Sequence, residues 1–99
     1  MPEIASSENT DCSNLSFVTA LTSPVASVVT TLVIGDVLSV ELTAPSSLRV
    51  FNANGVLVGS LLTTYRDAIV NCIQKGTNFT ATVTKIIGGN CDVRIKSIW

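Results

Sequence analysis

The chain has 99 residues, which is room for one domain. Its residues are 46% hydrophobic and 13% charged, so the composition excludes a disordered chain. No stretch holds the ~18 consecutive apolar residues that a membrane-spanning helix needs. Histidine is absent, which excludes Ser-His-Asp and Cys-His catalysis and every His-ligated metal site. A net charge of −1 argues against a strongly basic protein that coats DNA.

The two ends of the chain differ in character. Residues 1–14 are polar and carry three acidic side chains, so we expect a flexible acidic tail followed by a single domain over 15–99. The first residues lack the basic region and the apolar core of a secretory signal. Short glycosylation sequons at Asn14 and Asn78 matter only if the chain is secreted.

Three cysteines, Cys12, Cys72 and Cys91, form an odd set that suits a reducing compartment better than a disulfide framework. No two of them have the spacing of a metal-binding pair, so we expect no metal and no cofactor. We predict that Cys72 and Cys91 are small buried residues, and whether these two pair stays open. The expected location is the cytoplasm.

The segment patterns are typical of short strands. Strands are predicted over 17–21, 25–34, 37–43, 48–51 and 56–61, with a final pair on either side of a Gly88-Gly89-Asn90 turn. Residues 37–43 alternate most clearly, and β-branched residues dominate 25–34. Asn54-Gly55 is a strong hairpin signal. Gly59 indicates a bulge or a close backbone approach, and Ile86-Ile87 break the alternation as a bulge would.

One helix is predicted over about 64–75. Thr64 is its expected cap with Asp67 in the capping-box position, and Gly76 is its expected stop. The apolar stripe of this helix must pack on a sheet, since about twelve residues form a marginal helix alone. Its members are Tyr65, Ala68, Ile69, Cys72 and Ile73. The fold class that follows is mainly β (α+β): a small antiparallel, partly open β-barrel of five to six strands with one packed α-helix.

The hairpin over 50–61 with its Val58-Gly59-Ser60-Leu61 step, the helix, and the strand pair split by Gly88-Gly89 resemble the HIRAN family over about residues 37–98. The resemblance rests on spacing and glycines. It implies a variant of the OB barrel that binds single-stranded DNA, often at an end, and commonly sits beside helicase or nuclease domains. The acidic, Asn-containing segment that those domains carry before the hairpin has no counterpart in 44–49, and no nucleotide-contacting residue is carried over by motif.

Nucleic-acid binding needs phosphate neutralisers and stacking surfaces. The candidate binding residues are Arg49, Phe51, Lys85, Arg94 and Lys96, which form one stripe if their strands adjoin. The alternative is that the four bases keep an outer sheet face soluble. Phe17 and Trp99 are further candidate platforms, whereas Tyr65 and Phe79 are expected in the core.

We predict no catalytic residue. Tyr65 and Asp67 lie two apart on the predicted helix and point to different sides, and no base is tuned near neutral pH. The predicted function is a non-catalytic binding module, with single-stranded nucleic acid as ligand. The alternative is a protein–protein interaction or oligomerisation adaptor, for example in a microbial or viral defence system, because the chain has more apolar residues than a small monomer readily hides. A homo-oligomer or a protein partner is therefore expected, and no membrane.

Overall fold

A computed structural model describes residues 12, 15–43 and 47–98 of the chain. The six strands of its sheet are β1 (Ser16–Ala20), β2 (Val37–Thr43), β3 (Ser47–Phe51), β4 (Leu57–Leu61), β5 (Asn78–Ile87) and β6 (Asn90–Ile98). Two helices within the described residues are α2 (Ala26–Val29) and α3 (Arg66–Gln74).

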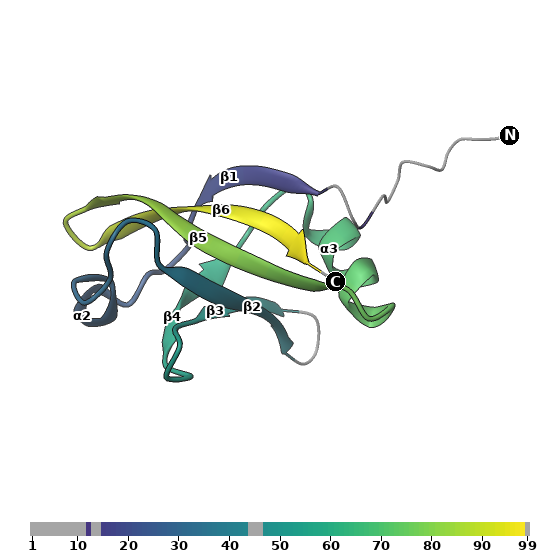
Figure 1. The fold of residues 1–99 in the computed structure, drawn as a ribbon, viewed down its shortest axis with the longest axis horizontal. Coiled ribbons are helices and arrows are strands. Elements are labelled where there is room, and N and C mark those ends of the chain that lie inside the picture. Colours follow the sequence, from purple (N-terminus) through teal and green to yellow (C-terminus); the bar gives the residue numbers. More distant parts are fainter. Residues whose placement is uncertain (1–11, 13–14, 44–46, 99) are drawn as a thin grey trace, which may run out of the picture.

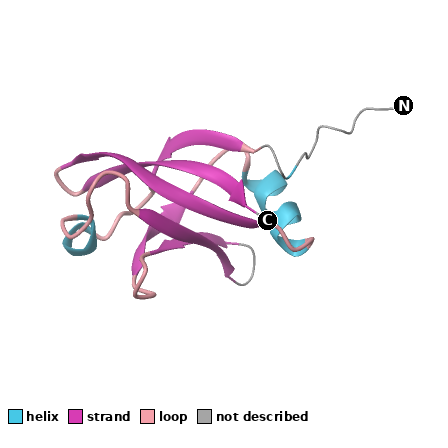
Figure 2. Ribbon diagram, in the orientation of Figure 1, coloured by secondary structure: helices cyan, strands magenta, loops and turns pink. Residues whose placement is uncertain are grey.

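All neighbouring strands run antiparallel, in the order β1-β6-β5-β2-β3-β4. The sheet curls into a half-barrel, with α2 at one end and α3 at the other (Figures 1 and 2). The predicted mainly-β class, a small and partly open antiparallel barrel with a packed helix, is confirmed.

The core lies on the inner face of this curled sheet. In β6, Cys91, Val93 and Ile95 are buried while Arg94 and Lys96 between them are exposed, which is the period of two of a half-buried strand. Helix α3 adds Ile69 and Cys72, both fully buried, from one end of the barrel. The other buried apolar residues of the cluster are Leu21, Val29, Leu32, Leu38, Val40, Leu48, Val50, Val58, Leu61, Phe79, Ala81 and Val83.

The two edges of the sheet meet at one point. Beyond β1, Thr22 exchanges two backbone hydrogen bonds with Ser60 of β4, at 2.8 and 2.9 Å. Gly59 makes this approach possible, because a Cβ there would lie 3.3 Å from Leu21 Cβ and 3.3 Å from Pro24 Cα. The predicted close backbone approach at Gly59 is confirmed.

The predicted strand over 25–34 is wrong. Val25 donates a backbone hydrogen bond to Val58 at 2.7 Å, and the chain then turns into the single helical turn α2. Val29 and Leu32 are buried there, and Ala26 lies against Gly89 at the β5–β6 turn. β-propensity is weak enough for tertiary packing to override it, and a compact turn covers the open end of the barrel core as an extra strand would not.

The predicted start of α3 is also wrong. The N-cap is Tyr65 and no side chain caps it, while Thr63 Oγ1 accepts a hydrogen bond from the Tyr65 N–H at 3.2 Å. Asp67 lies in the first turn, 91% exposed, and pairs with Arg66 instead. The end agrees with prediction: Gly76 has φ +104° and follows the C-cap, as a left-handed helix stop requires.

Two turns refine the sequence-based expectations. The β3–β4 turn spans four residues, with the Gly55 N–H donating to Asn52 O at 2.9 Å, and Gly55 alone in it has a positive φ. The Asn52 side chain accepts hydrogen bonds from the backbone N–H groups of Asn54 and Val56, each at 2.9 Å. The bulge expected at Ile86-Ile87 lies earlier, between Val83 and Lys85. Residues 44–46, between β2 and β3, lie outside the described residues, and Ser47 begins β3.

A disulfide joins Cys12 to Cys72, which corrects the expectation of three reduced cysteines. The Cα atoms are 5.6 Å apart, and Cys72 is fully buried on α3. Cys91 is free and buried, as predicted. The expected cytoplasmic location rested partly on the odd cysteine count, and this bond removes that support. The predicted tail over 1–14 lies outside the described residues apart from Cys12. Among the described residues, no helix is long and apolar enough to cross a membrane.

We predict that the disulfide contributes strongly to stability, because it links two residues that are 60 positions apart in the chain. We expect Cys12→Ala/Cys72→Ala to lower the free energy of unfolding by about 2–4 kcal/mol, mainly by freeing the unfolded chain. Urea unfolding followed by circular dichroism measures this. Cys91→Ala is the matched control, since it removes a buried sulfur without removing a bond. Equal decreases in the two variants would contradict the prediction.

Burial, and secondarily the charge of Asp92, raises the pKa of the Cys91 thiol above its ordinary value of 9.0. The unfolded chain therefore ionises this thiol at a lower pH than the folded protein does. The contribution of the Cys91 thiol to the free energy of unfolding is fully present below about pH 9. It is lost as the pH rises through the pKa of the folded state, and the free energy of unfolding then falls by up to about 1.4 kcal/mol per pH unit. Unfolding free energies of wild type and Cys91→Ala at several pH values measure it. A constant difference between the two proteins from about pH 8 to about pH 10 would rule it out.

Candidate nucleic-acid interface

Arg94 and Lys96 lie two residues apart on the outer face of β6, both exposed. Thr82 and Thr80 of β5 stand opposite them in register, and Val18 and Ser16 of β1 flank them on the other side. The Thr80 hydroxyl donates to Lys96 O at 3.4 Å. This part of the outer face is therefore a hydroxyl-rich surface with two positive charges.

Lys85 lies on the same outer face but nearer the β5–β6 turn. The bulge after Val83 places it opposite Asp92 in the ladder. An acidic neighbour directly across the strands offsets much of the field that Lys85 would present to a phosphate.

Arg49 and Phe51 share the outer face of β3, as their spacing predicts. Arg49 is exposed and stands between Glu41 of β2 and Ser60 of β4, so, like Lys85, it has an acidic neighbour directly across the strands that offsets part of its field. Phe51 is partly exposed and stands opposite Ser39, whose hydroxyl donates to Phe51 O at 3.4 Å.

The strand order decides which predicted residues come together. β5 and β6 adjoin, so Lys85 shares one part of the face with Arg94 and Lys96. β2 and β5 lie between β3 and β6, which separates Arg49 and Phe51 from Arg94 and Lys96 by three strand spacings, or roughly 14 Å, and from Lys85 on β5 by two. The five residues share one face but divide into two groups.

Arg49 instead meets a second arginine. A pocket of about 370 Å³ lies between β3, the end of β4, the segment after β1 and the start of α3. Arg49 and Arg66 both line it, together with four hydroxyl side chains and three leucines. The other lining residues are Thr22, Ser23, Ser47, Ser60, Leu48, Leu61 and Leu62. Another pocket, of about 480 Å³, has Asp36 and, among the described residues, no basic residue in its lining.

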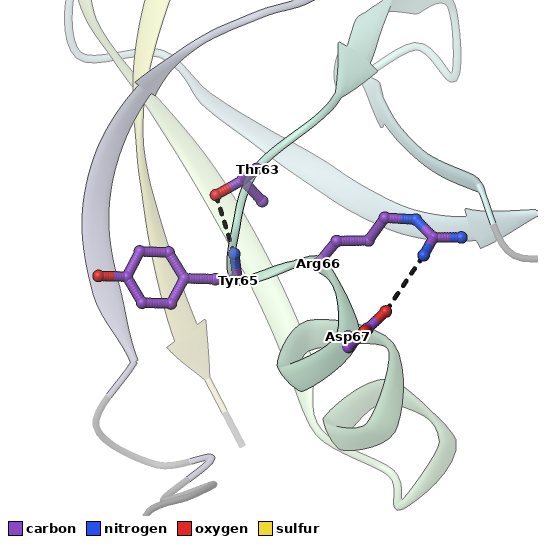
Figure 3. Close-up of polar contacts among 4 residues, drawn as sticks. All are labelled: Thr63, Tyr65, Arg66 and Asp67. Atoms are coloured by element: carbon purple, nitrogen blue, oxygen red, sulfur yellow. Dashed lines mark hydrogen bonds and ion pairs between the residues drawn. The ribbon is translucent and has the colours of Figure 1, made fainter.

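The start of α3 directs two side chains in opposite directions. Tyr65 points toward β1 and Arg66 points away from it, from consecutive positions (Figure 3). Arg66 Nη1 lies 3.2 Å from Asp67 Oδ1, and its side chain is 38% exposed. Asp67 is almost fully exposed, so this ion pair is weak.

The hydroxyl side of the pocket is built where the barrel closes. Ser60 pairs with Arg49 on one side and with Thr22 on the other, so these three residues form one row across adjacent backbones. Ser23, next along, has φ +48°, the left-handed region that non-glycine residues rarely adopt. Closure of the sheet therefore places the segments that carry Thr22 and Ser60 side by side next to Arg49.

Two expectations for the aromatic residues need correction or completion. Tyr65 is 48% exposed and not in the core, and its ring stacks on Phe17 with centroids 4.6 Å apart. Phe79 is buried, as predicted. Phe17 and Phe51 are both partly buried, and Phe17 is already engaged in the ring pair with Tyr65. Trp99 lies outside the described residues.

Arg66 was missed from the sequence as a site residue. Helix periodicity placed it on the polar side of α3, where a solvated charge is the ordinary interpretation. Its partner Arg49 lies seventeen positions earlier in the chain, on a strand. Only the packing of α3 against the end of the barrel brings both residues to the lining of one pocket, and no local pattern encodes that placement.

Within residues 12, 15–43 and 47–98, no group of three or more His, Cys, Asp or Glu side chains could hold a metal ion. The described residues that line the pocket with Arg49 and Arg66 include hydroxyl-bearing residues and no Asp, Glu or Cys. Guanidinium and hydroxyl groups are hydrogen-bond donors of the kind that suit an anion.

No family model matches the chain, and no match emerges among curated proteins or solved structures.

Proposed function

We propose that the protein is a non-catalytic module that binds single-stranded nucleic acid, with one backbone phosphate held between Arg49 and Arg66. The observation that carries this proposal is the pocket itself, whose lining includes two arginines and four hydroxyl-bearing residues. Guanidinium forks match the oxygens of a phosphate and bond to them in pairs. Hydroxyls supply further donors without adding charge.

The outer face supports a path for the strand that leaves this pocket. Phe51, Ser39, Thr80 and Lys96 stand in register across β3, β2, β5 and β6. Phe51 offers a surface on which a base stacks, and Lys96 with Arg94 offers charge for a second phosphate. Hydroxyls between them keep the intervening surface polar. The resemblance of the chain to the HIRAN family, whose members bind single-stranded DNA, points in the same direction.

The arginine pocket predicts the effect of removing either guanidinium. We expect Arg49→Ala and Arg66→Ala each to weaken binding of a single strand of about 12 nucleotides roughly tenfold, because each removes a charge-assisted hydrogen bond. Arg66→Lys should fall between Arg66→Ala and wild type, because it keeps the charge without the fork. Fluorescence anisotropy at low salt measures all three.

Lys75→Ala is the matched control for these variants, because Lys75 is an exposed base at the far end of the same helix. It should bind as wild type does. If wild type binds no single strand at low salt, the proposed function fails. If Arg49→Ala and Arg66→Ala bind as tightly as wild type, the ligand lies elsewhere on the molecule.

The second group of bases makes a separate prediction. Arg94→Glu/Lys96→Glu should weaken binding and flatten its dependence on salt, by about 0.7 in the log–log slope for each phosphate that the variant no longer neutralises. The titration is repeated at several salt concentrations. A slope equal to that of wild type would show that these two side chains bind no phosphate.

A second candidate function is a protein–protein adaptor. The observation that favours it is the exposure of large apolar side chains near α2, where Val33, Ile34 and Ile87 are each at least 60% exposed. If oligonucleotides fail to bind at low salt, this candidate replaces the first. Under this candidate function, we expect Ile34→Ser to lower the binding of an apolar dye such as ANS without changing the circular dichroism spectrum.

A further inference from the structure

The outer edge of β1 carries backbone groups that lack partners. In the ladder with β6, the Ser97 N–H donates to Leu15 O at 3.1 Å and the Leu21 N–H donates to Cys91 O at 2.9 Å. Hydrogen bonds alternate along an antiparallel strand, so the odd-numbered residues of this stretch face β6. Ser16, Val18 and Ala20 therefore direct their N–H and C=O groups away from the sheet.

Only one end of this edge is occupied. Thr22, the next residue of the same parity, exchanges its outward hydrogen bonds with Ser60 of β4. β4 ends at Leu61, and Thr22–Ser60 is an isolated bridge, so β4 forms no ladder with β1 itself. Apart from a weak 3.4 Å contact of the Thr19 hydroxyl with Ala20 O, these outward groups have no hydrogen-bond partner in the described part of the chain.

The edge also lacks the features that normally prevent pairing. Soluble proteins protect sheet edges with charged side chains, proline or bulges. β1 reads Ser-Phe-Val-Thr-Ala and pairs with β6 in unbroken register over all five residues. Its outer side chain Val18 is 50% exposed, and Tyr65 beside Phe17 on the inner side is 48% exposed. Backbone and side chains on this edge are both open to a partner.

We propose that β1 pairs antiparallel with β1 of a second copy of this chain, about a two-fold axis at Val18. Each outward group then finds its complement: Ser16 pairs with Ala20 of the second copy, Val18 with Val18, and Ala20 with Ser16. The strand is self-complementary because its three outward residues are centred on Val18. The two half-barrels become one continuous sheet across an isologous interface.

Side chains on both faces fit this register. On the outer face the two Val18 side chains meet, and on the inner face Phe17 stands opposite Thr19 of the second copy, beside the exposed Tyr65 ring. The nearest like charges are the two Arg94 residues, each one strand further out. They are roughly 14 Å apart, beyond the screening length of about 10 Å at 0.1 M salt. Dimerisation does not depend on the proposed nucleic-acid function.

Light scattering coupled to size exclusion, over increasing protein concentration, tests the proposal. Wild type should rise from 10.4 kDa toward twice that mass. Val18→Pro removes an outward N–H without removing a bond to β6, and should weaken association at least about tenfold. Val18→Lys should do the same by opposing two like charges across the axis. Val37→Lys is the matched control, because Val37 is 59% exposed in the same row of the outer face, three strands away.

A wild-type mass that stays at 10.4 kDa throughout overturns the proposal, as does a dimer that persists in Val18→Lys. Circular dichroism shows whether Val18→Pro is folded, and if it is not, Val18→Lys decides. Register has its own readout: under mild oxidation Val18→Cys should form a covalent dimer, since directly opposed residues have Cα atoms about 5.5 Å apart. Val37→Cys should not, and equal cross-linking of both variants would place the contact elsewhere.

Discussion

The contact between two backbones at Gly59 is the constraint on which the rest of the structure depends. A half-barrel of six strands leaves its first and last strands apart, and its core open between them. The absence of a side chain at Gly59 lets the segment after β1 reach β4, so that Thr22 and Ser60 pair and Val25 bonds to Val58. Any side chain there would meet Leu21 and Pro24 at distances tighter than ordinary packing allows.

Closure at this point also explains where the candidate site lies. The row of Thr22, Ser60 and Arg49 exists because three separate stretches of chain come side by side there. Helix α3 covers the adjoining end of the barrel with Ile69 and Cys72, and its first residue, Arg66, reaches the same pocket. The same packing of α3 that buries its apolar side chains therefore also places Arg66 at the pocket.

The sequence predicts the strands well where side chains alternate, as in β2 and β6, because a half-buried strand needs a period of two. It fails over 25–34, where β-branched residues favour a strand but the available space is the end of a barrel. It predicts the end of α3 from Gly76, whose left-handed conformation is a local requirement. It misses the cap, since Thr64 is a good cap by type, whereas the N-cap in the structure is Tyr65 and no side chain caps the helix.

The site divides in the same way. Arg94 and Lys96 are found from strand alternation alone, because both lie on one strand. The pairing of Lys85 with Asp92 depends on a bulge that lies earlier in β5 than the broken alternation suggested. The meeting of Arg49 with Arg66, and the bond of Cys12 to Cys72, join residues distant in the chain. Such contacts follow from topology, which local patterns do not specify.

The position of Ser60 has one more consequence. Its backbone holds the barrel shut, while its side chain lines the arginine pocket. An anion that binds more tightly to the aligned row than to a separated one must, by thermodynamic reciprocity, favour the shut barrel to the same degree. If the proposed anion binds in this way, occupancy of the pocket and the pairing of Thr22 with Ser60 belong to one equilibrium.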